Sequence, residues 1–161
     1  MVERAGVNQW QLVQALSILA LLDEITDEAI ITYTPGDASE NVFLLFETAL
    51  RGDAKEVRRM ITALKYQQEP HMLLGLLSSQ ALSLAAVITA SGTDDNPEKD
   101  FAIHPFVAKK MRYYTKKINQ KDLAAIIEVF ALADSSLKRS KAEPWLLIEQ
   151  ALFKVAKIVK S

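Results

Sequence analysis

The chain has 161 residues, half of them apolar and 24% charged, which is the composition of one globular domain or of one and a half small ones. The absence of cysteine excludes disulfides, thiolate metal sites and cysteine nucleophiles, and His71 and His104 lack a ligand partner at helical spacing, so we expect no metal and no cofactor. The net charge is −1, but residues 1–50 are acidic and residues 51–161 basic, a split that suits either a basic face for phosphate or an acidic face for a basic partner.

Two short helices are predicted at the start of the chain. Asn8 can cap the first, whose apolar stripe runs through Leu12 and Leu22, and the second begins at Thr26 and stops near Pro35. The apolar run from Leu12 to Leu22 is too short to cross a bilayer, for which about 20 residues are needed. The first residues also lack the order of a secretion signal, so we expect a soluble cytoplasmic protein without membrane contact. The connector "TPGDASE" is the best domain boundary, which divides the chain into residues 1–36 and 37–161.

The next two helices are predicted from caps and apolar spacing. Apolar residues recur at three- and four-residue steps rather than alternating, which favours helices over strands. A third helix is expected over about residues 41–51, ending at Gly52 in a left-handed C-cap. Asp53 and Glu56 form a capping-box pattern for a fourth helix. The inward residues of these two helices are Val42, Phe43, Phe46, Leu50, Val57, Met60, Ile61 and Leu64.

Prolines suit the first turn of three later helices, which we expect to begin at Pro70, Pro105 and Pro144. The helix from Pro70 runs to about Ala90 and is apolar nearly all round, so it should be central. Asn96-Pro97 opens a short helical turn, and Asn119 caps a helix whose stripe is Leu123, Ile126, Ile127, Phe130 and Leu137. The sequence therefore predicts an all-α fold of about eight helices in an orthogonal or bundle-like array.

The stretch "FAIHPFVAKKMRYYTKKINQKDL" carries six basic residues and no acid between Ile103 and Lys121. The spacing of Val107, Met111, Tyr114 and Ile118 turns one face inward. The opposite face holds Tyr113 with the cations Lys109, Lys110, Arg112, Lys116 and Lys117. This face is either the solvated side of a core helix or a site that neutralises phosphates of nucleic acid. Arg139 and Lys141, in the loop before Pro144, are further candidates for DNA contact.

Two other polar residues have both a structural and a functional interpretation. His104 stands where a helix N-cap belongs, and no partner for a general base is visible nearby. Asp134 and Lys138 have the spacing of a helical ion pair, although a partly buried acid can also serve an interface. Because phosphate-cradling, nucleophile-elbow and zinc-protease motifs are absent, we expect neither an enzyme nor a small-molecule substrate.

Several segments in one order resemble the C-terminal half of the bacterial DNA polymerase III delta subunit, which is a component of the sliding-clamp loader. "NVFLLFETALRGDAKEVRRMITAL" resembles the family's first collar hairpin, and "EP" begins a long apolar helix. "FAIHPFVAKKM" resembles its Gly-[Val/Ile]-His-Pro-Tyr-x-x-Lys pattern, and "LADSSLKRSKAEPWLLIEQALFKV" its closing segment. The upstream "NQWQLVQALSILALLDEITDEAI" looks like the end of its lid module. Phe101-Ala102 stands where the family usually has Leu-Gly, and Phe106 where it has Tyr.

The resemblance implies a helical collar domain over residues 37–161, preceded by a remnant of the lid module. Such collars pack side by side with gamma/tau-like ATPase and delta-prime-like subunits, and here would contact primed DNA weakly. The module that grips and opens the clamp lies outside the resemblance, so clamp opening is not expected. The interface candidates, which are equally well explained as core residues, are Phe43, Phe46, Trp145, Leu146 and Phe153. The alternatives are a free-standing nucleic-acid-binding module and a general helical adaptor.

Overall fold

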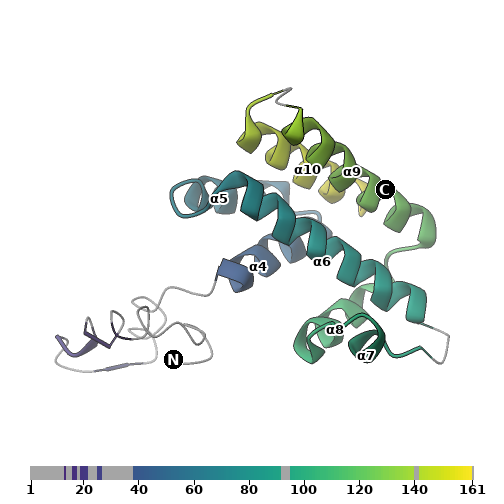
Figure 1. The fold of residues 1–161 in the computed structure, drawn as a ribbon, viewed down its shortest axis with the longest axis horizontal. Helices are drawn as coiled ribbons and strands as arrows, with labels where there is room; N and C mark the ends of the chain where they lie inside the picture. The colour runs from purple at the N-terminus through teal and green to yellow at the C-terminus, as the bar shows by residue number, and fades with distance from the viewer. Residues whose placement is uncertain are drawn as a thin grey trace. The chain divides into compact units, whose positions relative to one another are not determined.

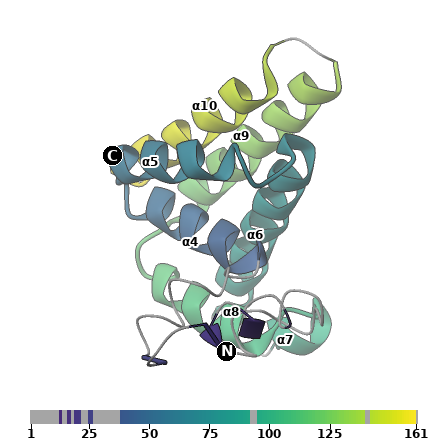
Figure 2. The same ribbon diagram turned by 90° about the vertical axis from the view of Figure 1, so that its left-hand side faces the viewer.

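The computed structural model of the chain describes residues 38–91, 95–139 and 142–160, together with a few positions between 13 and 26. The described residues form helices and no strand, which confirms the predicted all-α class. The helices are α4 (Ala38–Leu50), α5 (Ala54–Leu64), α6 (Pro70–Ala90), α7 (Pro97–Asp100), α8 (Pro105–Met111), the 3-10 helix η1 (Arg112–Tyr114), α9 (Gln120–Lys138) and α10 (Pro144–Ile158). They are shown in Figures 1 and 2.

Two compact units can be separated, Met1–Asn41 and Val42–Ser161, and all helices from α5 onward belong to the second. The two helices predicted before residue 36 lie largely outside the described residues. The boundary proposed between residues 36 and 37 also lies there and stays a prediction.

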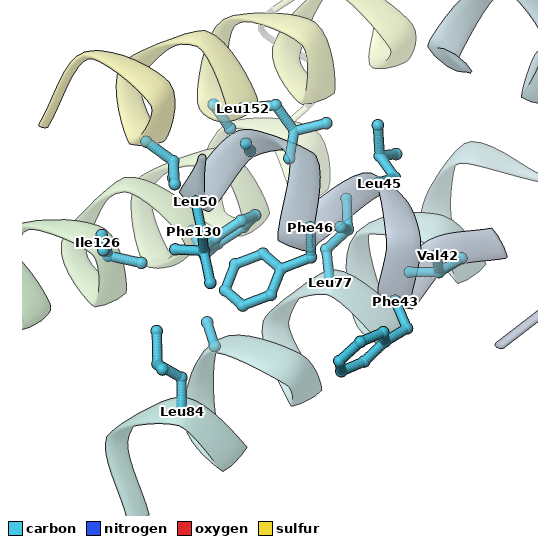
Figure 3. Close-up of a cluster of buried hydrophobic side chains, with 14 of the residues drawn as sticks. Val42, Phe43, Leu45, Phe46, Leu50, Leu77, Leu84, Ile126, Phe130 and Leu152 are labelled. Carbon is cyan, nitrogen blue, oxygen red and sulfur yellow. The ribbon is translucent and has the colours of Figure 1, made fainter. Parts of the chain in front are cut away.

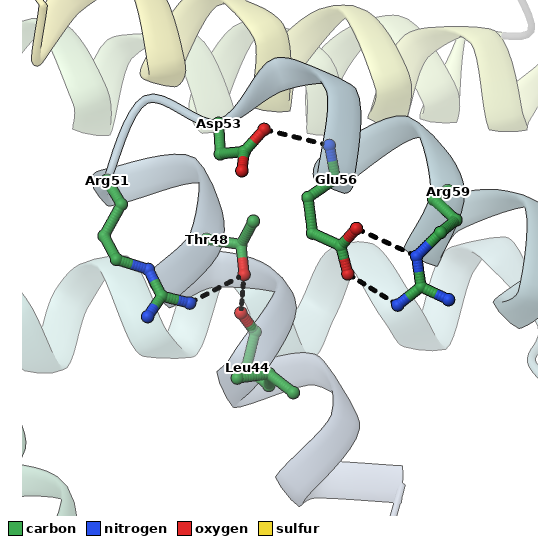
Figure 4. Close-up of polar contacts among 6 residues, drawn as sticks. All are labelled: Leu44, Thr48, Arg51, Asp53, Glu56 and Arg59. Atoms are coloured by element: carbon green, nitrogen blue, oxygen red, sulfur yellow. Dashed lines mark hydrogen bonds and ion pairs between the residues drawn. The ribbon is translucent and has the colours of Figure 1, made fainter.

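Helix ends fall where local signals place them. Gly52, at a φ of 76°, ends α4 in the left-handed region, and the side chain of Asp53 then accepts a hydrogen bond from the backbone N–H of Glu56 at 3.0 Å (Figure 4). Only this half of the predicted capping box forms, because the backbone N–H of Asp53 donates to Thr48 and the carboxylate of Glu56 binds Arg59 at 2.8 Å. The hydrogen bond from Arg59 lowers the pKa of Glu56.

The helix α6 is central, as predicted. It packs against α8, α9 and α10, and its buried face consists of Leu73, Leu74, Leu77, Ala81, Leu84 and Val87. By length and composition alone it is also apolar enough to cross a membrane, a test that the core helices of globular proteins also pass. Within the described part of the chain, α6 is the one helix that is long and apolar enough for this.

The core is organised around Phe46 of α4. Its side chain is 0% exposed, and its ring centroid lies 5.9 Å from that of Phe130 on α9. Figure 3 shows the ring of Phe46 close to Leu77 of α6 and Phe130 of α9. One aromatic side chain thus fills the space where α4, α6 and α9 meet.

The basic segment is less regular than predicted. The single helix expected after Pro105 ends at Met111, and a 3-10 turn follows, after which the backbone N–H groups of Lys117 and Ile118 both donate to the carbonyl of Tyr114. The tighter turn still buries Met111, Tyr114 and Ile118, because residues spaced by three or four stay on one face of either helix type. Similarly, α4 begins at Ala38, slightly before the predicted start near residue 41.

Ala102, between α7 and α8, has a φ of 51°, in the left-handed region. This conformation costs a residue with a Cβ about 1–2 kcal/mol, whereas glycine adopts it freely. The chain therefore carries local strain in the turn that leads into α8.

We predict that Ala102→Gly stabilises the chain by about 0.5–1 kcal/mol, because the relief of strain exceeds the entropy that glycine adds to the unfolded state. Chemical denaturation measures the change. The control is Ala124→Gly at an exposed position of α9, which should destabilise by about 1 kcal/mol. Equal losses for the two variants would show that Ala102 is unstrained.

We predict that Phe46→Ala lowers the free energy of unfolding by about 3–5 kcal/mol, since it leaves a cavity between three helices. Leu44→Ala, in the same helix but at an exposed position, should cost about 1 kcal/mol. Urea denaturation of both variants compares them. A similar small loss in both would contradict the central role of Phe46.

Candidate assembly and nucleic-acid surfaces

The cations of the basic segment have different environments. Arg112 forms an ion pair with Glu98 of α7, with 2.8 Å between Nη2 and Oε1. The ammonium of Lys117 lies 4.2 Å from the ring centroid of Tyr113 and 2.6 Å from its hydroxyl. Lys109 and Lys116 are exposed and have no partner within the described part of the chain. Two of the predicted DNA-contact residues thus present a free charge.

Lys110 has a structural environment that the sequence pattern did not indicate. Its ammonium lies 4.8 Å from the ring centroid of Phe43 on α4 and 4.7 Å from that of Phe106 on α8. The two ring centroids are 6.5 Å apart. A cation at these distances is attracted by the electron-rich faces of both rings. Lys110 therefore joins α8 to α4, and its charge is already engaged within the chain.

The remaining polar candidates lie at helix ends. Nδ1 of His104 accepts a hydrogen bond from the backbone N–H of Phe106 at 3.3 Å, which confirms His104 as the N-cap of α8. Lys138 and Asp134 form the predicted ion pair, with 2.6 Å between Nζ and Oδ2. Arg139 is exposed at the end of α9, where a cation complements the helix dipole. Lys141 lies outside the described residues.

The apolar interface candidates differ in accessibility. Phe46 has no exposed surface and Phe43 is buried against Phe106. On α10, Trp145 and Phe153 are half-buried and Leu146 is 45% exposed. The guanidinium of Arg58 on α5 covers Phe153 at 5.2 Å and also pairs with Glu149 at 3.1 Å. Leu146 is therefore the candidate that presents the most accessible apolar surface.

One buried polar contact was not predicted. The hydroxyl of Tyr114 donates a hydrogen bond to Glu47 at 3.4 Å, linking η1 to α4. Burial, followed by the negative charge of Glu47, raises the pKa of Tyr114 far above its ordinary value, so the phenol stays protonated. Nearby, the buried hydroxyl of Thr48 donates to the carbonyl of Leu44 and accepts from Arg51 (Figure 4). The polar groups of these side chains are thus hydrogen-bonded within the fold, and their role is structural.

Among the described residues, no three His, Asp or Glu side chains come together in a group that would hold a metal ion. The surface instead offers free cations near α8 and apolar side chains on α10. These groups can bind other molecules through charge and apolar contact. The protein is therefore an all-helical domain that presents cations near α8 and apolar side chains on α10.

Comparison with known proteins identifies the family. The sequence model of the C-terminal domain of the DNA polymerase III delta subunit matches residues 39–155. The chain belongs to this family. The fold is similar to that of the Bacillus subtilis DNA clamp loader delta protein, with a TM-score of 0.79 at 20% sequence identity. The similarity covers 97% of this chain and 48% of that protein, so the chain spans about half of its length. No curated protein sequence matches the chain.

We predict that Lys110→Met lowers the free energy of unfolding by about 1 kcal/mol, because the cation between two aromatic rings is lost while the apolar stem is kept. Lys109→Met is the matched control, since the neighbouring side chain is exposed and has no partner within the described residues, and it should change stability by less than about 0.5 kcal/mol. Thermal unfolding of both variants tests the difference. If the two variants are equally stable, the ring contacts of Lys110 contribute nothing.

Proposed function

We propose that the chain acts as the helical collar domain of a clamp-loader delta subunit and assembles with the ATPase and delta-prime-like subunits of the loader. The observation that carries this proposal is the family match over residues 39–155, which are the residues that build the helical unit. The chain would supply binding energy and geometry rather than bond chemistry, and we propose no catalytic role. We place this activity in the cytoplasm, during the loading of sliding clamps at primed DNA.

The accessible apolar surface of α10 supports an assembly role. An interface between subunits needs an apolar centre that loses its water on binding and a polar rim around it. Leu146, with Trp145 and Phe153 beside it on α10, offers an accessible apolar group of this kind. Phe46 has no surface to contribute, and Phe43 is covered, so we leave both out of the proposed interface. Their contribution is to hold α4 in the core.

We further propose weak DNA contact through the free cations. Lys109 and Lys116 are available near α8. Arg139 at the end of α9 is a further candidate, as is Lys141, which lies outside the described residues. Arg112 and Lys110 are engaged with Glu98 and with aromatic rings, and we expect them to contribute less. Few phosphates would be neutralised, so the interaction would be weak and dependent on salt.

For the assembly, we predict that the chain co-elutes in gel filtration with the loader ATPase and delta-prime-like subunits of its own source, in the absence of DNA. Leu146→Asp should weaken this association by about tenfold or more, because a charge would be buried in the apolar centre. Thr62→Asp, which adds the same charge to the exposed face of α5, is the control and should associate normally. A chain that elutes alone in every mixture would refute the assembly role.

For the DNA contact, we predict a linear fall in the logarithm of the binding constant with the logarithm of salt concentration. Lys109→Ala and Lys116→Ala should each reduce the slope by about 0.9 on duplex DNA, whereas Lys110→Ala should leave the slope nearly unchanged. Fluorescence anisotropy at several salt concentrations measures these slopes. Tight DNA binding by a chain that ignores the loader subunits would instead support a free-standing nucleic-acid-binding module.

A further inference from the structure

The exposed face of α6 carries no charge. From Pro70 to Ala90 the helix contains no Asp, Glu, Lys or Arg, although part of it faces solvent. Met72 and Leu82 on this face are 52% and 61% exposed. The accessible side of a core helix normally carries charged residues, whereas the centres of protein interfaces are depleted of them and enriched in apolar side chains. This face has the composition of an interface.

A hollow of about 340 Å³ lies between this face and α9. On α6 it is lined by Gly75, Ser78 and Leu82, and on α9 by Ile127, Ala131 and Asp134. Small side chains on both walls leave room for a side chain from outside, and the lining is mostly apolar. The buried ring of Phe130 forms part of its base, so the hollow rests on the packed core rather than on a loop.

Gly75 keeps this hollow open, and nothing inside the described part of the chain requires it to be glycine. Its backbone is not in the left-handed region, and a Cβ added there would have no atom within 4 Å. Glycine within a helix is less favourable than alanine by roughly 1 kcal/mol. The chain thus tolerates a destabilising residue at a position where its own packing would accept alanine. A glycine at this position would allow another molecule to approach the helix closely.

The one charged group that lines the hollow within the described residues is Asp134. Only its Oδ2 atom binds Lys138, and the ion pair lies at the surface, where exchange of one cation for another costs little. An apolar hollow with a carboxylate on its wall complements an aliphatic side chain next to a basic one on the same helix. We therefore expect the bound molecule to be a helix that carries an aliphatic side chain next to a basic one.

We propose that the hollow between α6 and α9 receives a helix of a neighbouring clamp-loader subunit, which inserts an aliphatic side chain beside Gly75 and places a basic side chain over Asp134. This inference rests on the proposed assembly function and adds a second contact surface, on α6 and α9, to the one proposed at Leu146 of α10. It makes the uncharged face of α6 the apolar centre of an interface between subunits.

The test measures the affinity of the chain for the purified loader subunits by titration calorimetry. Gly75→Leu fills the hollow and should weaken binding at least about tenfold. Gly75→Ala should raise the midpoint of thermal unfolding by about 2–4 °C while it weakens binding, so loss of binding could not be ascribed to damage of the fold. Asp134→Asn should weaken binding and reduce its dependence on salt. Ala63→Leu, which adds an isopropyl group to the exposed face of α5, should leave the affinity unchanged.

The binding measurements distinguish failure of the proposed α6/α9 contact from failure of the proposed assembly function. If the unmodified chain binds no loader subunit, the assembly function fails and the inference fails with it. If the unmodified chain binds and Gly75→Leu binds equally well, assembly stands but uses another surface, and the inference is overturned. If sedimentation shows that the chain alone forms a dimer that Gly75→Leu disrupts, the occupant is a second copy of the chain and the proposed partner is wrong.

Discussion

The side chain of Phe46 is packed at the point where α4, α6 and α9 meet. Phe46 of α4 reaches Phe130 of α9 across the buried face of α6, so segments far apart in the sequence are fixed by one contact (Figure 3). Because interiors are close-packed, a helix held in this way cannot shift without leaving a void. Core packing around Phe46 therefore sets the relative positions of α4, α6 and α9, whose surfaces include the hollow beside Gly75.

The same helix serves the core and the surface. One side of α6 supplies the buried leucines, and the other is uncharged, holds Gly75 and borders the hollow against α9. The basic segment shows a similar division of roles. Lys110 holds α8 against α4 and Arg112 holds η1 against α7, while Lys109 and Lys116 remain free within the described part of the chain. In both places the residues that bind outside molecules would be those that the fold does not use.

Most helix limits could be predicted from the sequence because the signals that set them are local. Asp53, His104 and Asn119 cap the helices that follow them, and the predicted prolines begin α6, α8 and α10. The environments of the cations could not be predicted, because the partners of Lys110 and Arg112 lie on other helices and depend on how the helices pack. Packing also determines the exposure of Leu146, the burial of Phe46 and the hollow beside Gly75. The spacing of apolar residues in the sequence does not predict these features.

The absence of cysteine allows the central claim, that α6 lies at the centre of an interface between subunits, to be tested directly. Leu82→Cys places a single thiol at the edge of the hollow, and Thr62→Cys places one on the exposed face of α5. The rate of alkylation of each thiol is measured with and without the loader subunits. If α6 lies in the interface, the subunits exclude the reagent and slow the reaction at position 82 at least about tenfold, while the rate at position 62 stays unchanged. Equal rates at position 82 with and without bound subunits would contradict this claim.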